Sequence, residues 1–434
     1  MQTGKLKKIF HKPAIPSALV LLLLCSPPLS TAETSGDADA PLLKMLELAR
    51  KQQEQLRIQA DQIRERAKVI EELKRQVDAM APQDSPSLKE APQTVTSVND
   101  RIKLSVSGQI NRAVNIVSDG SATRLYHVDN SASGSRFRFV GTAGLNSDFV
   151  LGTRLEVGIT PDRSSLVSQT DQTPSDFLTV RWADISLESR LLGKLYIGKG
   201  DTASKGTAVK DLSRTDVVQY INVGLTGGGL RFRESDAGHR ITNVKVRDSF
   251  KSLDGLGRIS RLRYDTPSFM GAFASASVAG NHKSDLGLHW GARGFGLQAA
   301  AGAALSNHRT SGSALQYDGS LSVLHVASGL NLTFSGGIQN RKTGKDATNL
   351  YAKLGWIANL NRLGYTAFGV DYTNSGNLPA TDNRGYSAGA AVVQSFDSLA
   401  TELYLQYRIY SLKQAIGPRL DDIQITTIGA RIKF

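Results

Sequence analysis

The last nine residues, Thr426-Thr427-Ile428-Gly429-Ala430-Arg431-Ile432-Lys433-Phe434, alternate in polarity from one position to the next. Ile428, Ile432 and Phe434 fall on one side of an extended chain, and Arg431 and Lys433 fall on the other. Successive side chains of a β-strand point to opposite faces of its sheet. The stretch therefore predicts a strand with one apolar and one cationic face, which suits a wall between lipid and water.

The same alternation recurs upstream of this terminal strand. In 135–139 the rings of Phe137 and Phe139 share one face and two arginines share the other, and in 151–159 Arg154 and Glu156 lie opposite a largely apolar row. Short segments of this kind, separated by Gly, Asn, Asp and Ser, follow one another from residue 101 onward. They predict sixteen strands, although fourteen or eighteen also fit the boundaries. The segments are 102–116, 134–142, 149–159, 178–188, 194–199, 257–265, 271–279, 285–290, 294–304, 316–326, 329–339, 348–358, 363–373, 385–394, 400–410 and 423–434.

The connections between these strands alternate in length. Links such as 144–148 and 189–193 are short, whereas 119–133 and 161–177 are long, and the longest connection is 200–256. Antiparallel barrels of bacterial outer membranes have short periplasmic turns and long external loops. The fold expected for 100–434 is therefore an all-β, transmembrane antiparallel barrel with both ends of its sheet in the periplasm.

The segments before the barrel have three different characters. Residues 1–32 contain four lysines, the apolar run 18–24 and a small-residue site ending at Ala32, which predicts a secretory signal peptide. The apolar run is too short to span a bilayer as a helix. A lipoprotein anchor at Cys25, the only cysteine, is an alternative reading.

Residues 33–80 are expected to form a periplasmic coiled coil, and 81–99, which contain three prolines, a linker. From Pro41 to Met80 there is no Gly and no internal Pro, and an apolar column recurs every seven residues. The column consists of Leu42, Ala49, Leu56, Ile63, Ile70 and Val77. A solvated charged helix that serves as a spacer is the alternative.

The positive charge is concentrated in the predicted barrel. Residues 100–434 contain 38 Lys and Arg against 27 Asp and Glu, an excess of 11. Such a balance indicates acidic partners, and export argues against nucleic acid. Neither metal-ligand spacing among the histidines nor a phosphate-binding loop is present, since Gly227-Gly228-Gly229 lacks the lysine that such a loop requires. We expect no enzyme activity, catalytic residue, cofactor or metal.

Five segments of the predicted barrel form a recognisable series: Gly134 to Gly141, Trp182 to Glu188, Gly193 to Asp201, Arg263 to Phe269, and the terminal Phe434. In their order and spacing, which cover roughly residues 100–434, they resemble the trimeric porins of Gram-negative outer membranes. An N-terminal coiled coil ahead of a sixteen-stranded barrel is most similar to the DcaP-like porins, with phosphate-selective porins the next nearest family. The resemblance implies a homotrimer, an inner loop within 200–256 that narrows the pore, and uptake of dicarboxylates and other small organic anions.

Anion passage requires fixed cations on the water-filled side of the wall, and arginine binds carboxylates bidentately while it stays charged. Strand alternation nominates Arg136, Arg138, Arg154, Arg261 and Arg263 as pore-lining, anion-binding residues. Arg181 is nominated by the porin resemblance, because alternation around it is ambiguous. The long connection, where 199–263 hold 13 basic and 7 acidic residues, adds Lys205, Lys210, Arg214, Arg231 and Arg233.

Each nominated residue also has a structural interpretation. Any one cation could neutralise a carboxylate such as Glu156 or contact lipopolysaccharide at the barrel rim. Tyr404, Tyr407 and Tyr410 lie near strand ends and could form the aromatic girdles of a membrane barrel.

Two functional hypotheses follow. The first is a passive diffusion channel of the bacterial outer membrane for small anions, embedded in lipid and lipopolysaccharide, whose coil bundles three N-termini in the periplasm. The second is a structural anchor or tether, whose coiled coil spaces the membrane from the cell wall. Deletion of 42–80 separates the two, because a tether loses envelope integrity while uptake per barrel stays normal.

Overall fold

The computed structural model describes residues 102–175, 177–236, 238–309 and 313–434, together with 94–96 and scattered positions between 50 and 68. The chain divides into two compact units, Met1–Ser87 and Leu88–Phe434. In the first unit the described positions are helical, with Asp61 and Glu65 each within 4 Å of a basic side chain one turn further on. The predicted signal peptide and most of the predicted coiled coil lie outside the described residues. No described helix is long and apolar enough to cross a membrane.

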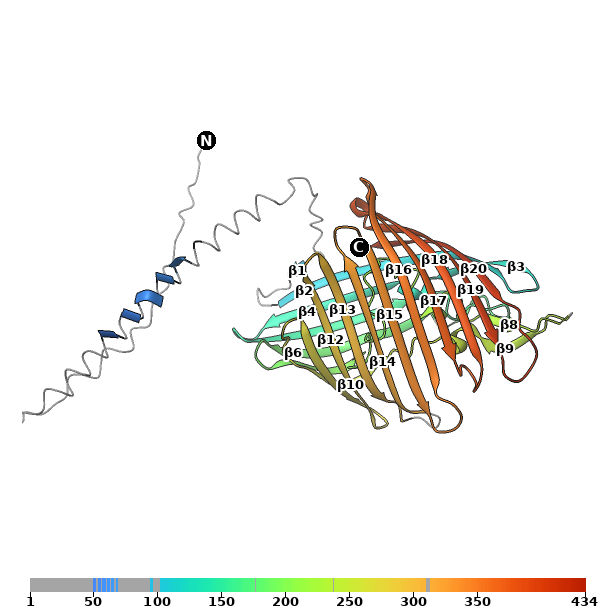
Figure 1. Ribbon diagram of the computed structural model, residues 1–434, viewed down its shortest axis with the longest axis horizontal. Coiled ribbons are helices and arrows are strands. Elements are labelled where there is room, and N and C mark those ends of the chain that lie inside the picture. The colour runs from blue at the N-terminus through green and yellow to red at the C-terminus, as the bar shows by residue number, and fades with distance from the viewer. Residues whose placement is uncertain are drawn as a thin grey trace, which may run out of the picture. The chain divides into compact units, whose positions relative to one another are not determined.

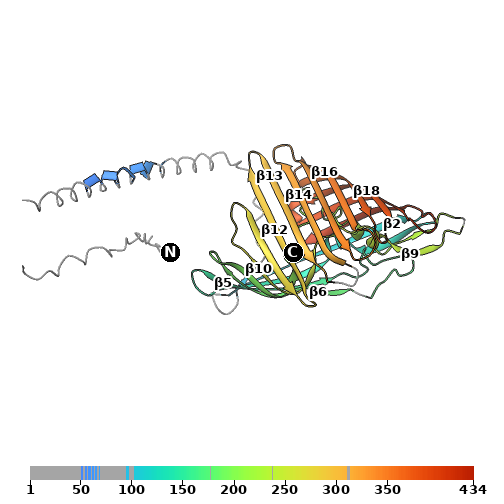
Figure 2. The same ribbon diagram turned by 60° about the horizontal axis from the view of Figure 1, so that its bottom comes forward.

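The second unit is a closed antiparallel barrel, in which sixteen strands of the described chain form the wall (Figures 1 and 2). Each of the sixteen predicted strands overlaps one observed strand. The wall consists of β2 (Ile102–Ser118), β4 (Arg136–Gly144), β5 (Phe149–Ile159), β6 (Leu178–Ser189), β7 (Gly193–Asp201), β10 (Arg258–Asp265), β11 (Ala272–Ala279), β12 (Lys283–Gly294), β13 (Leu297–Asn307), β14 (Ser313–His325), β15 (Leu330–Arg341), β16 (Ala347–Asn361), β17 (Gly364–Gly376), β18 (Arg384–Phe396), β19 (Thr401–Lys413) and β20 (Ile423–Lys433).

The barrel closes where the first and last wall strands meet. β2 pairs with β20 through partners such as Val114 and Ile428, and with β4 through partners such as Val106 and Phe139. The short strand β1 (Thr94–Thr96), within the predicted linker, also pairs with β2. Closure leaves the wall without a free edge, which a bilayer requires of a β-structure.

The two faces of the wall differ as the alternation predicts. On β20 the side chains of Ile428 and Ile432 are about half exposed, at 52% and 51%, whereas Thr427 between β19 and β2 is buried. On β5, Leu155 is exposed and Glu156 is fully buried. Apolar side chains therefore cover the outside of the barrel, and most polar and charged side chains of these strands point inward.

The connections differ between the two ends of the barrel. One end carries the short turns 145–148, 190–192, 266–271, 295–296, 326–329, 362–363 and 397–400, the last containing η3 (Asp397–Leu399). The other end carries most of the longer ones: 119–135 with β3 (Thr123–Asp129) and η1 (Ser131–Ser133), 160–177, 202–257, 280–282, 308–312, 342–346, 377–383 and 414–422. The predicted alternation of lengths therefore holds except at 280–282. We call this second end the mouth.

Residues 202–257, the inner segment, fold back into the barrel, close to the predicted 200–256. They contain η2 (Val223–Leu225), the hairpin of β8 (Arg231–Arg233) and β9 (Ile241–Lys245), and the one-turn helix α2 (Val246–Ser249). Figure 1 shows β8 and β9 at the same end of the barrel as β3.

An apolar core joins the inner segment to one side of the wall. Phe232, Phe250 and Leu230 of the inner segment pack with Ile423 and Ile425 of β20 in one buried cluster. The inward face of β20 is therefore cationic near Arg431 but apolar towards the mouth, so the interior is not lined by polar groups throughout. Tyr404 and Tyr410, two of the candidates for the membrane girdles, are buried in this core, whereas Tyr407 is exposed.

Candidate functional site

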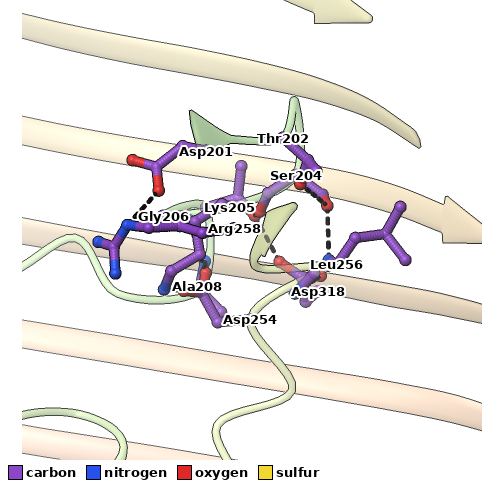
Figure 3. Close-up of polar contacts among 12 residues, drawn as sticks. Asp201, Thr202, Ser204, Lys205, Gly206, Ala208, Asp254, Leu256, Arg258 and Asp318 are labelled. Atoms are coloured by element: carbon purple, nitrogen blue, oxygen red, sulfur yellow. Dashed lines mark hydrogen bonds and ion pairs between the residues drawn. The ribbon is translucent and has the colours of Figure 1, made fainter. Parts of the chain in front are cut away.

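Ion pairs hold the two ends of the inner segment together (Figure 3). Lys205, near its beginning, forms an ion pair with Asp254, near its end. Asp254 also accepts hydrogen bonds from the backbone N–H of Gly206 at 2.8 Å and of Ala208 at 3.2 Å. Burial alone would lower the pKa of Lys205, but Tyr220 and Asp254 raise it above the usual value, so the amine stays charged.

Side chains of the wall fasten the middle of the inner segment. Lys353 of β16, whose side chain is fully buried, donates to Asp211 at 2.7 Å and to the carbonyl of Gln219 at 2.6 Å. At Gly302 of β13 a Cβ atom would come within 2.8 Å of Thr207, so glycine allows the segment to lie against the wall. The inner segment is therefore a fixed part of the interior.

The space that remains is a cavity of about 890 Å³ between the inner segment and the opposite wall. Its lining is strongly cationic, because eight basic side chains face three carboxylates among the described residues. The basic residues are Arg136, Arg163, Arg181, Lys205, Arg247, Lys251, Arg258 and Arg431, and the acidic ones are Asp216, Asp248 and Asp254.

The charges are distributed unevenly between the two sides of the cavity. All three carboxylates belong to the inner segment, which also contributes Lys205, Arg247 and Lys251. The barrel and its connection 160–177 contribute five arginines to this lining and, in the part of the chain that the structure describes, no acid. The barrel side therefore carries the excess positive charge.

A cluster of three arginines around Glu156 supports this cationic side. Arg138 Nε lies 2.6 Å from one Glu156 oxygen and Arg154 3.3 Å from the same oxygen, while Arg181 Nε lies 2.5 Å from the other. The carboxylate is fully buried, whereas the arginine side chains are 23% to 36% exposed. One buried negative charge thus holds three partly solvated positive charges, which leaves a net charge of about +2.

A β-bulge explains why Arg181 could not be placed by alternation. On β6, Trp182 pairs with Glu156 but Val180 pairs with Val157, so Arg181 is the extra residue. Arg181 lines the cavity, and the neighbouring Trp182 is buried instead of facing lipid. The guanidinium carbons of Arg154 and Arg258 lie 3.8 and 4.0 Å from the centroid of the Trp182 ring, close enough for cation–π attraction.

The structure brings some of the nominated cations together and separates others. Arg136, Arg181 and Lys205 line the cavity, and Arg138 and Arg154 share Glu156 with Arg181. Lys210 is half-buried in the inner segment, where burial lowers its pKa, and exposed Arg214 lies over the ring of Tyr365 at 4.5 Å.

Arg261 and Arg263 are placed in the wall, where they fasten the start of the inner segment. Arg261 binds Asp184 at 2.7 Å and the carbonyls of Gly198 and Asp201, and Arg263 binds Asp265 at 2.7 Å and the carbonyl of Thr202. Both side chains are nearly buried, at 2% and 11% exposed. Their geometry is that of structural ion pairs.

Arg231 and Arg233 lie in the β8–β9 hairpin at the mouth, away from the cavity lining. Arg231 donates to Asn243 at 3.1 Å, and Arg233 donates to Asp119 at 2.9 Å. Asp119 also binds Arg124 and Gln169. Burial alone would raise the pKa of Asp119, but its bonds from Arg233, Gln169 and the backbone hold it below the usual range.

Sequence reasoning missed several cavity residues. Arg247 and Lys251 follow the hairpin that turns the chain back into the barrel, and Arg258 stands at the very start of β10, where alternation from Arg261 would place it on the lipid side. Arg431, by contrast, was placed on the inward face by the alternation of the last strand, and it lies in the cavity with a 2.6 Å bond to Glu402.

No family model matches the chain, and no curated protein matches it either. Solved structures do. The anion-selective porin from Comamonas acidovorans is 15% identical, with a TM-score of 0.50, and the match covers 77% of this chain and 100% of that one. OmpF of Salmonella typhi, solved with daunomycin, is 14% identical at a TM-score of 0.50, covering 79% and 100%. The outer membrane channel DcaP of Acinetobacter baumannii is 10% identical at 0.50, covering 78% and 99%. At these identities the likeness shows the fold, a porin-like barrel of sixteen strands.

Proposed function

We propose that this protein is a porin through which small anions diffuse passively across a bacterial outer membrane, and that organic anions such as dicarboxylates are its solutes. The observation that carries the proposal is the lining of the 890 Å³ cavity, where eight basic side chains face three acidic ones. Fixed cations lower the cost for an anion to enter a narrow aqueous pore and raise it for a cation.

The arrangement of the arginines favours passage over tight binding. Arg136, Arg181, Arg258 and Arg431 come from four different strands and line one cavity. Several are already engaged by Glu156, Asp201 or Glu402, so an incoming carboxylate competes for part of each guanidinium. Conduction requires several weak sites of this kind, because a solute must also leave.

The comparisons support the proposal at two points. One of the similar structures is named an anion-selective porin, and another is the outer membrane channel DcaP. The resemblance of the sequence to DcaP-like porins adds dicarboxylates as the expected solute class. With the mouth outside the cell, the short turns and both ends of the sheet face the periplasm, and we assign the coiled coil expected for 33–80 to the same compartment.

Uptake into proteoliposomes tests the solute class. Succinate and an uncharged sugar of similar size would be compared in swelling assays of vesicles that contain the purified full chain. The proposal predicts faster entry of succinate, and a double variant Arg136→Gln, Arg181→Gln should lose most of the difference. Equal entry of both solutes in the unaltered protein would count against anion preference.

We also propose that three barrels associate, as the porin resemblance implies. The mass of the purified protein in a mild detergent should equal three chains, both for the full chain and for a form without 42–80 if the barrels themselves provide the contacts. A monomeric full chain would remove the trimer from the proposal, and a monomer only after deletion would assign the association to the N-terminal helix.

A further inference from the structure

A second hollow, of about 590 Å³, opens at the mouth beside the cavity. It lies between β9 and α2 of the inner segment, the end of β15, and the connections 342–346 and 377–383. It shares Asp248, Lys251 and Gln339 with the lining of the 890 Å³ cavity, so the two spaces adjoin. We call this hollow the vestibule.

The vestibule has its own positive charge. Lys245, Lys251 and Arg341 line it, together with one carboxylate, Asp248. Within the described residues none of the three cations has an ion-pair partner. Arg341 donates one hydrogen bond to the carbonyl of Pro379, at 3.3 Å, which holds its side chain at the edge of the hollow and leaves other N–H groups for a ligand.

Apolar surface lies next to these cations. Val244 is half-buried, Pro379 is exposed, and both line the vestibule together with buried Leu378. The deeper cavity also has apolar residues in its lining, such as Leu225 and Leu253, among charged, hydroxyl and glycine residues. In the vestibule an inorganic anion is stabilised only by its attraction to the fixed cations, whereas a carboxylate on a hydrocarbon body also removes apolar surface from water.

We propose that the vestibule is a capture site for small organic carboxylates, with the carboxylate at Lys245 and Arg341 and the hydrocarbon body against Val244 and Pro379. Lys251, which lines both spaces, passes the anion to the arginines of the cavity. This rests on the proposed function and deepens it. The site concentrates organic anions at the mouth side, and it distinguishes them from phosphate or chloride before they reach the 890 Å³ cavity.

Sided inhibition of chloride current in planar bilayers tests the site. Benzoate is the probe, because it combines one carboxylate with an apolar ring, and phosphate is the comparison. Benzoate added on the mouth side should reduce the chloride current at lower concentration than benzoate added on the turn side, and at lower concentration than phosphate. In the double variant Lys245→Gln, Arg341→Gln the half-inhibiting concentration on the mouth side should rise about fourfold, since each exposed ion pair contributes roughly a factor of two.

The chain offers a matched control. Lys342 and Lys345 stand on the connection 342–346, but neither is among the residues that line the vestibule, and Lys345 pairs with Asp382 at 2.5 Å. The double variant Lys342→Gln, Lys345→Gln removes the same charge from the same rim and should leave benzoate inhibition unchanged. Single-channel conductance in KCl, close to that of the unaltered protein, would show that both variants form folded pores.

The outcomes separate the site from the proposed function. An anion-preferring channel with equal benzoate inhibition from both sides, unaffected by Lys245→Gln and Arg341→Gln, would overturn the vestibule and leave the function standing. Equal inhibition by benzoate and phosphate on the mouth side would overturn the selection for organic anions. A cation-preferring channel would overturn the proposed function itself and the capture site with it.

Discussion

Replacement of Glu156 by Gln removes the one negative charge that holds Arg138, Arg154 and Arg181. The side chains have nearly the same size, so the change is almost purely electrostatic. Breaking a buried ion pair from one side costs about 3–5 kcal/mol. The three arginines are 23% to 36% exposed, and solvent screens part of their repulsion, so we expect a loss of about 2–3 kcal/mol in the stability of the barrel.

The same substitution should increase the preference for anions. Arg181 both touches Glu156 and lines the cavity, so an anion at Arg181 lies one guanidinium away from the altered charge. In water a unit charge at about 8 Å is worth about 0.5 kcal/mol, or a factor of about two in the local concentration of a monovalent ion. The higher local concentration of chloride and the lower local concentration of potassium together raise the ratio of chloride to potassium permeability by up to about fivefold.

Reversal potentials in a KCl gradient measure this ratio, and thermal unfolding in detergent measures the stability. The control is Glu156→Gln combined with Arg138→Gln, which restores the net charge and should return the ratio towards that of the unaltered protein. An unchanged ratio in well-folded Glu156→Gln pores would refute the reasoning, because it would mean that ions pass too far from the cluster to respond to it.

Three further predictions concern other parts of the interior. Trp182→Leu removes cation–π contacts of roughly 0.5–2 kcal/mol each with Arg154 and Arg258, and it should lower the anion preference in reversal-potential measurements. Trp356→Leu, on the exposed outer face, should leave the anion preference unchanged. Lys353→Met leaves buried Asp211 unpaired, which should destabilise the barrel by about 3–5 kcal/mol and make the single-channel conductance larger and noisier. Adding Asp211→Asn to Lys353→Met should partly reverse both effects. Asp119→Asn should destabilise the mouth by about 2–3 kcal/mol at neutral pH. The folded pKa of Asp119 lies below the ordinary value of about 4, so the stabilisation from its carboxylate is complete above that pH and is lost as the pH falls further. The difference in thermal unfolding between Asp119→Asn and the unaltered protein should therefore disappear in strong acid.

The wall of the barrel could be predicted from sequence because its signals are local. Most strands of the wall alternate with a period of two, and turn-forming residues separate most neighbours. Ile428 and Thr427 illustrate this, since the alternation alone assigned them to opposite faces and their exposures, 52% and 2%, agree. Burial of one face fixes the register of such strands.

The candidate site was less accessible to sequence reasoning, because it depends on departures from regular alternation. The bulge at Arg181 shifts β6 by one residue, and nothing in the local sequence around Trp182 marks the shift. Arg258 lines the cavity from the first position of β10, where the strand has barely begun. Sequence alternation assumes a continuous strand, and at both places that assumption fails.

The path of the inner segment also could not be read from the sequence. The isolated pairing of Glu234 with Leu420 and the bond from Arg233 to Asp119 carry the β8–β9 hairpin to the mouth. These contacts join residues more than a hundred positions apart. They explain why the nominated Arg231 and Arg233 are absent from the cavity lining while Arg247 and Lys251, not nominated, belong to it.

The most direct test of the central claim is the reversal potential of the purified full chain in a planar bilayer with a KCl gradient. The excess of basic side chains in the cavity predicts a reversal potential with the sign of the chloride equilibrium potential. Arg136→Glu combined with Arg181→Glu should shift it towards the potassium equilibrium potential. A reversal potential with the sign of the potassium equilibrium potential in the unaltered protein would contradict the account. So would a reversal potential that the double variant does not change.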